Sequence, residues 1–175
     1  MMLNENTTTV QDVKTDVASR GGAFALTSLL DLLDEGDPIR SNTFTYHLYQ
    51  SDTTVRGGLW DASANEACSA LDAMTDAMVR DVLDASNDKT KQATMSFRSR
   101  RRVLMDAGVI DPSDNELLSA TYIVGRCRAR LGDGIDAAWA NAVRGLIHTA
   151  ATHLLARYTD WRKRKGALPL PGVGD

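Results

Sequence analysis

The chain has 175 residues, of which 43% are hydrophobic and 25% charged, with a formal net charge of −3 at pH 7. That length and hydrophobic content suit one domain that buries its core without a metal or a disulfide bond. The N-terminus lacks a signal-peptide pattern and no stretch has the roughly eighteen apolar residues of a membrane span. We therefore expect a soluble protein, in the cytoplasm or in a particle assembled inside the cell.

The charges are unevenly distributed along the chain. Residues 1–88 carry 5 basic and 15 acidic side chains, and residues 89–175 carry 15 basic and 8 acidic ones, so the halves have net charges of −10 and +7. Such halves can neutralise each other by packing together, stack head to tail with copies of the chain, or present the basic half to a polyanion.

The N-terminal residues predict a polar arm followed by a helix. We expect a flexible arm over residues 1–9 and a helical pattern from residue 10 to Glu35, where Gly36 ends the helix and Pro38 follows. Gly21 and Gly22 interrupt this pattern. They mark either a junction between two helices or a close approach by another backbone.

Residues 43–56 change from helical to alternating periodicity. Phe44, Tyr46 and Leu48 alternate with polar residues, which is typical of a strand. A return strand over residues 53–55 would complete a small β-hairpin, although Ser51-Asp52 is a weak turn signal. An irregular loop is the alternative.

Ser63 and Glu66 have the spacing of a capping box and predict the start of the next helix. Its exposed side would carry a row of acids, Asp72, Asp76, Asp81 and Asp84. Its buried side would carry an apolar stripe formed by Ala64, Ala67, Leu71, Met74, Met78 and Val82. Asp72 and Asp76 are four residues apart, as paired catalytic carboxylates can be. Without a nearby histidine or cysteine, such a pair is more often solvated than catalytic.

The segment after Asp88 is strongly basic. We expect a helix over residues 90–107, ended by Gly108, and a second helix that starts at Asp111-Pro112 and ends at Leu131. The basic residues that could contact phosphates or an acidic partner are Arg98, Arg100, Arg101, Arg102, Arg126 and Arg130. Alternatively, these arginines pair with the acidic row of the preceding helix.

The longest predicted helix covers residues 135–165. It has apolar residues every three or four positions from Ile135 to Trp161, with Arg144 and Arg157 among the polar residues of the opposite face. At 1.5 Å per residue it would be roughly 45 Å long, so several other helices must pack along it. Residues 166–175 predict a disordered tail or an extended peptide that contacts a protein partner through Leu168, Leu170 and Val173.

The sequence lacks recognisable catalytic, cofactor-binding and metal-binding motifs. No phosphate-binding glycine loop, nucleophile elbow, calcium loop or zinc motif is present. His148 and His153 are five residues apart, a spacing that turns the two rings away from each other on a helix. Cys68 and Cys127 lie far apart in helical patterns, so we interpret them as buried thiols of a reducing compartment.

These observations predict an all-α, single-domain bundle of about five helices over residues 10–165, with the hairpin at residues 43–56 as an optional element. We expect a non-enzymatic interaction or assembly protein, forming a homo-oligomer or a subunit of a larger complex such as a viral one. The alternative is a sequence-independent nucleic-acid-binding protein that uses the basic half. We expect no cofactor, no small-molecule substrate and no membrane contact.

Overall fold

The computed structural model describes residues 25–85, 96–114 and 116–165. Within these ranges the chain forms one 3-10 helix and five α-helices and no strand, which confirms the all-α prediction. The elements are η1 (Leu26–Leu32), α2 (Asn42–Arg56), α3 (Trp60–Ala85), α4 (Phe97–Asp106), α5 (Glu116–Ala129) and α6 (Ala137–Lys165). The predicted arm, the Gly21-Gly22 junction and the C-terminal tail lie outside these ranges.

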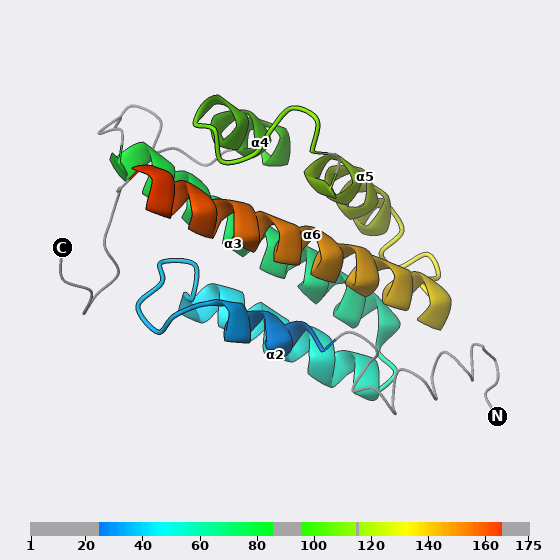
Figure 1. Ribbon diagram of the computed structural model, residues 1–175. Coiled ribbons are helices and arrows are strands. Elements are labelled where there is room, and N and C mark those ends of the chain that lie inside the picture. The colour runs from blue at the N-terminus through cyan, green and yellow to red at the C-terminus, as the bar shows by residue number, and fades with distance from the viewer. Residues whose placement is uncertain (1–24, 86–95, 115, 166–175) are drawn as a thin grey trace.

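Two long helices, α3 and α6, run side by side through the middle of the bundle (Figure 1). Helix α2 covers one side of this pair and α4 and α5 cover the other, while η1 contacts both α2 and α6. The predicted long C-terminal helix is present as α6, but the helix that contacts all of the other α-helices is α3.

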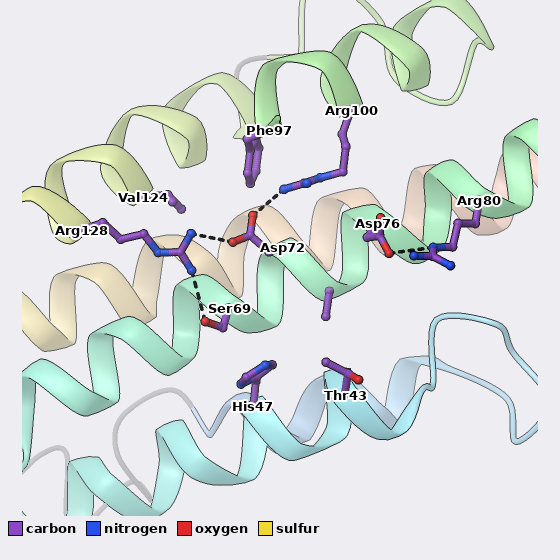
Figure 2. Close-up of a pocket in the computed structure, with 11 residues that line it drawn as sticks. Thr43, His47, Ser69, Asp72, Asp76, Arg80, Phe97, Arg100, Val124 and Arg128 are labelled. Atoms are coloured by element: carbon purple, nitrogen blue, oxygen red, sulfur yellow. Dashed lines mark hydrogen bonds and ion pairs between the residues drawn. The ribbon is translucent and has the colours of Figure 1, made fainter. Parts of the chain in front are cut away.

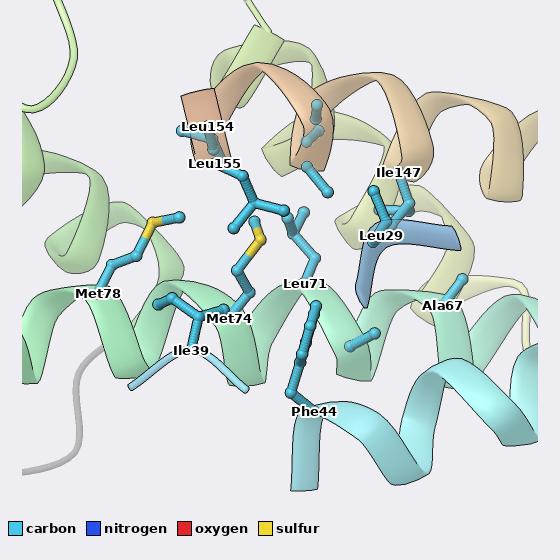
Figure 3. Packing of buried hydrophobic residues seen from close by; sticks show 14 of the residues in the cluster. Leu29, Ile39, Phe44, Ala67, Leu71, Met74, Met78, Ile147, Leu154 and Leu155 are labelled. Atoms are coloured by element: carbon cyan, nitrogen blue, oxygen red, sulfur yellow. The ribbon is translucent and has the colours of Figure 1, made fainter. Parts of the chain in front are cut away.

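The hydrophobic core is one cluster to which all six helices contribute. Met74 and Met78 of α3 point toward Leu154 and Leu155 of α6, and Phe44 rises from α2 beneath Leu71 (Figure 3). All of these side chains are at most 1% exposed. The spacing of three and four residues between Leu71, Met74 and Met78 places these side chains on one face of α3.

The predicted hairpin at residues 43–56 is wrong, because this segment is helix α2. Ser41 caps it by accepting a hydrogen bond from the Phe44 amide, and Phe44, Leu48 and Val55 form its buried face. Tyr46, which the alternating pattern placed with Phe44, is exposed. Burial against α3 at helical spacing outweighs the modest β-propensity of the aromatic and β-branched residues.

The predicted capping box at Ser63 is also wrong. Helix α3 begins at Trp60, and Ser63 is buried inside it, where its hydroxyl donates to the Ser51 carbonyl oxygen at 2.9 Å. Ser51 returns a 2.9 Å hydrogen bond to the Ser63 carbonyl oxygen. The pair joins α2 to α3, where the two helices approach closely.

The helix predicted to end at Glu35 is instead a short 3-10 helix over its described part. Asp52 of α2 holds the start of η1, because its carboxylate accepts 2.9 Å hydrogen bonds from the Leu26 and Thr27 amides. Leu33, which follows η1, is extended. The carboxylate of a residue in another helix therefore accepts the hydrogen bonds of the first amides of η1.

The boundaries of α4 and α5 differ from the predicted ones. Ser96 caps α4, which begins at Phe97 rather than residue 90, while its end at Gly108 is as predicted. Asp111 does not start a helix. It accepts hydrogen bonds from Ser113 and donates its amide to the Asp114 carboxylate, which closes a turn before α5 begins at Glu116.

Charged side chains from the two halves of the chain meet inside the bundle. Arg144 of α6, predicted to be exposed, is 0% exposed and pairs with Asp52. At the other end of α6, Arg162 lies 3.2 Å from Asp81 of α3, and Tyr158 donates to Asp81 at 2.5 Å. Burial and this hydrogen bond raise the pKa of Tyr158 well above its ordinary value of 10.0.

Candidate functional site

A polar groove of about 580 Å³ follows α3, with α2 on one side and α4 and α5 on the other (Figure 2). Four helices line it, through Thr43, His47, Ser69, Asp72, Ala73, Asp76, Arg80, Phe97, Arg100, Val124 and Arg128. A second hollow of about 580 Å³ shares Thr43, Ala73, Asp76 and Arg80 with it and extends toward Asp84. The groove is lined by charges of both signs.

Asp72 binds two arginines in this groove (Figure 2). It accepts hydrogen bonds from Arg100 of α4 at 2.5 Å and from Arg128 of α5 at 2.7 Å. Arg128 also donates to Ser69 at 3.2 Å. The Arg100 side chain is only 9% exposed, and its Nε donates to the Thr75 hydroxyl at 2.9 Å. One carboxylate thereby attaches both short helices to α3.

The six arginines predicted as a binding surface have different environments. Arg100 is buried against Asp72 and Thr75, and Arg101 is half-buried. Arg126 lies 5.7 Å from the Tyr122 ring, and Arg130 lies 4.9 Å from the Trp139 ring. Arg98 and Arg102 are exposed, and neither forms an ion pair with an acid in the described ranges.

Arg128 is a residue of the groove that the sequence did not single out. Its carboxylate partner is 56 residues away in the chain, and no local pattern connects the two. Only the packing of α5 beside α3 brings them together. The packing of α4 against α3 likewise decides that Arg100 rather than Arg101 is the buried arginine of α4.

A basic edge lies where α4 approaches the end of α6. The Trp161 indole donates to the Ala107 carbonyl oxygen at 3.1 Å, and Arg164 donates to the Gly108 carbonyl oxygen at 3.2 Å. These bonds join the segment after α4 to the C-terminal turn of α6. We call Arg98 and Arg102 of α4 and Lys163 and Arg164 of α6, all exposed, the basic edge; Arg164 also pairs with Asp160 at 3.0 Å.

The outer face of α2 is the most aromatic exposed surface in the described ranges. Tyr46 and Tyr49 are each 55% exposed and lie one turn apart. Thr53 and Arg56 continue the same side of the helix. We call Tyr46, Tyr49, Thr53 and Arg56 the tyrosine face. Its only charged member is Arg56, because the single acid of α2, Asp52, points into the bundle.

Each of the three histidines lies beside a polar side chain from another helix or turn. His47 lies 2.5 Å from Glu66, and His153 lies 3.4 Å from Asp114. His148 is 3.3 Å from the Ser28 hydroxyl, and burial and the nearby Arg144 lower the pKa of this histidine. Within the described ranges, no three histidine, cysteine or acidic side chains gather closely enough to hold a metal ion.

Among the described residues, none of the helices combines the length and the apolar character needed to cross a bilayer. The predicted contact residues Leu168, Leu170 and Val173 lie outside the described ranges. No known protein family, no curated protein and no solved structure matches this chain.

Proposed function

We propose that this chain is a helical assembly protein that associates with a second copy of itself through the tyrosine face of α2. The observation that carries this proposal is the pair Tyr46 and Tyr49, each 55% exposed on a helix whose other side is buried. Interface centres are enriched in tyrosine and arginine and depleted of acids, and this face has that composition.

The composition of the face favours a copy of the chain as the partner. Arg56 is the only charged residue of each face, and antiparallel pairing places the two Arg56 side chains at opposite ends of the interface, where their mutual repulsion is small. If two α2 helices pair antiparallel about an axis near Ser51, Arg56 of each copy lies over Tyr46 of the other, and Tyr49 lies against Thr53. A twofold interface needs such self-complementarity, and an arginine over a tyrosine ring is favourable.

The size of the face predicts a weak dimer. A buried tyrosine contributes roughly 150–250 Å², so two tyrosines with their neighbours supply less than the roughly 800 Å² per partner of a standard interface. We therefore expect dissociation in the micromolar range.

Light scattering on a size-exclusion column tests this proposal. The 19.0 kDa chain should approach twice its mass as the concentration rises through the micromolar range. The double variant Tyr46→Lys/Tyr49→Lys should remain monomeric, because it places four lysines at the interface. Tyr122→Lys on α5 is the matched control, since Tyr122 is 65% exposed and lies on another helix. A monomeric wild-type chain, or equal loss of mass in the control, would contradict the proposal.

A second candidate function is sequence-independent binding of a polyanion by the basic edge. Arg98 and Arg102 support it, because they are exposed one turn apart without an acidic partner in the described ranges. Arg100 does not serve this role, since it is engaged with Asp72.

Fluorescence anisotropy with a short single-stranded DNA tests this second candidate. Arg98→Ala/Arg102→Ala should weaken binding and reduce the salt dependence by up to about 1.4 units of log–log slope. Arg80→Ala, which removes an exposed arginine paired with Asp76, is the control and should leave binding unchanged. Absence of wild-type binding at low salt would rule the candidate out.

A further inference from the structure

The groove along α3 has small side chains at its base and larger ones on both sides. Ser69 and Ala73, one turn apart on α3, form the base of this hollow of about 580 Å³. His47 of α2 and Arg128 of α5 line it from opposite sides of α3 (Figure 2). The volume is within the range of about 300–1,000 Å³ that small-molecule sites have. A small ligand in this groove would meet an imidazole on one side and a guanidinium on the other.

Arg128 is accessible from the groove and is held in position by the protein. Its side chain is 38% exposed. Its Nη1 donates to Asp72 at 2.7 Å and its Nη2 donates to the Ser69 hydroxyl at 3.2 Å. A guanidinium has five N–H donors in a planar fork, so these two bonds fix its orientation and leave further N–H groups for a ligand. A carboxylate, which is also planar, matches that fork with two parallel hydrogen bonds.

The lining of the groove has an excess of positive charge. Asp72 is one carboxylate shared by the guanidinium groups of Arg100 and Arg128. Asp76, the other acid of the lining, is paired with Arg80 at 2.8 Å. Because each of these acids has a cation of its own and one arginine charge is left over, the groove favours an anion over a cation.

His47 provides a second donor for an anion. Its Nδ1 lies 2.5 Å from the Glu66 carboxylate, so Nε2 is the nitrogen left for a ligand. When the imidazole is protonated it neutralises Glu66, and its Nε2–H donates as well. Glu66, which holds His47, is three residues before Ser69, which holds Arg128. The two donors are therefore attached to α3 one turn apart.

An apolar surface completes the lining beside Arg128. Phe97 of α4 and Val124 of α5 both line the groove, and Val124 lies one turn before Arg128 in α5. Figure 2 shows Phe97 pointing from α4 toward Asp72. Phe97 is half-buried, so part of its ring is available for contact. An aromatic ring is the ligand group that gains most from burial against another aromatic ring.

We propose that this groove binds a small aromatic carboxylate. The carboxylate binds between Arg128 and His47, and the ring packs against Phe97 and Val124. Nothing in the sequence indicated such a ligand, because the lining residues come from four different helices. The site shares no residue with the tyrosine face or the basic edge, so ligand binding and the proposed self-association are separate properties.

NMR titration of the isotopically labelled full chain in a mildly acidic, low-salt buffer tests the proposal with benzoate, benzylamine and acetate. Benzoate should cause saturable shifts of the Ser69, Ala73 and Phe97 amide signals and of the Arg128 Nε–H signal. Benzylamine, which has the same ring and the opposite charge, should not bind, and acetate, which lacks the ring, should bind more weakly. Absence of benzoate binding in the groove, saturable benzylamine binding there, or equal affinities for benzoate and acetate would each overturn the proposal.

A pair of arginine variants tests the carboxylate contact. Arg128→Ala should weaken benzoate binding roughly 10- to 100-fold, because it removes charge-assisted hydrogen bonds. Arg126→Ala is the matched control, since Arg126 is an exposed arginine of the same helix that does not line the groove. Its affinity for benzoate should equal that of the wild type. Equal losses in the two variants would overturn the assignment of Arg128 as the carboxylate-binding residue.

A variant at the base of the groove keeps the test valid if Arg128→Ala loosens α5. Ala73→Leu fills the base without changing a charge and should abolish benzoate binding. Ala142→Leu adds the same volume at an exposed position of α6 and is the control. Far-UV circular dichroism should show wild-type helical content in both variants. Unchanged benzoate affinity in a folded Ala73→Leu variant would overturn the proposal.

Discussion

Arg144 of α6 and Asp52 of α2 form an ion pair in the interior of the bundle, although 92 residues separate them in the chain. Arg144 is 0% and Asp52 3% exposed. Asp52 also accepts hydrogen bonds from the amides of Leu26 and Thr27, so the pair connects η1, α2 and α6. Burial lowers the pKa of Arg144, while Asp52 acts against that shift.

Removal of the carboxylate at Asp52 should destabilise the fold more than removal of any exposed acid. Asp52→Ala leaves the buried Arg144 charge without its carboxylate partner, and breaking such a pair costs about 3–5 kcal/mol. Urea unfolding monitored by circular dichroism gives the free energy of unfolding. Asp34→Ala, at an exposed position, is the control and should change it by less than about 0.5 kcal/mol.

The double variant Asp52→Ala/Arg144→Met should recover part of that loss, because it removes both charges from the interior and retains apolar volume. Recovery should be incomplete, since the Leu26 and Thr27 amides still lack their acceptor. A double variant no more stable than Asp52→Ala would show that the buried Arg144 charge is not the main cost of losing the carboxylate.

Arg100 and Arg102 should differ in their effect on stability although they are two residues apart. Arg100→Ala loses the hydrogen bonds to Asp72 and Thr75 and the contact with the Phe97 ring, and should cost about 1–3 kcal/mol. Arg102→Ala should stay within about 0.5 kcal/mol because Arg102 is exposed. Equal effects in urea unfolding would contradict the assignment of Arg100 as the structural arginine of α4.

Ionisation of the buried Asp37 carboxyl should lower the free energy of unfolding as the pH rises above the acid range. Burial raises the pKa of its carboxyl above the ordinary 3.8, although the Ile39 amide and Arg162 act in the opposite direction. A carboxyl with a raised pKa in the folded state contributes stability that is complete below pH 3.8 and lost as the pH rises through the raised value.

Asp37→Asn should remove this loss, because a neutral amide keeps an oxygen for the Ile39 amide. The difference in unfolding free energy between variant and wild type should be near zero below pH 3.8 and grow in favour of the variant up to neutral pH. Urea titrations at several pH values measure it. A constant difference across this range would show that burial of the carboxylate is not the cause.

Two glycines should respond to alanine with opposite signs. Gly125 lies exposed inside α5 with open space around it, so Gly125→Ala should stabilise the protein by about 0.5–1 kcal/mol. Gly108 ends α4 with φ +82°, where a side chain is strained, so Gly108→Ala should cost about 1–2 kcal/mol. Melting temperatures of both variants test this, and a stabilising Gly108→Ala would contradict the strain argument.

The helical class and the long C-terminal helix could be predicted because both depend on local periodicity. The repeat of apolar residues every three or four positions between Ile135 and Trp161 belongs to a single helix, and the observed α6 follows it. Gly108 likewise ended a helix as predicted, since the left-handed conformation that it adopts is a property of glycine itself.

The errors arose where a distant segment decides the local structure. Residues 43–56 alternate like a strand, but their contact with α3 selects the helical face of Phe44 and Leu48. Ser63 resembles a cap, yet its partner is Ser51 in the preceding helix. Local propensities differ by about 1 kcal/mol or less, so the burial of a few side chains outweighs them.

Sequence alone therefore determined the all-α class, the existence of the long C-terminal helix and the opposed charges of the two halves. Only the tertiary structure decided which charges are internal: Arg144 with Asp52, Arg162 with Asp81, and Arg100 and Arg128 with Asp72. It also decided that the tyrosines of α2 face outward. The reason is that periodicity reports on one helix, whereas these pairings depend on how different helices pack against one another.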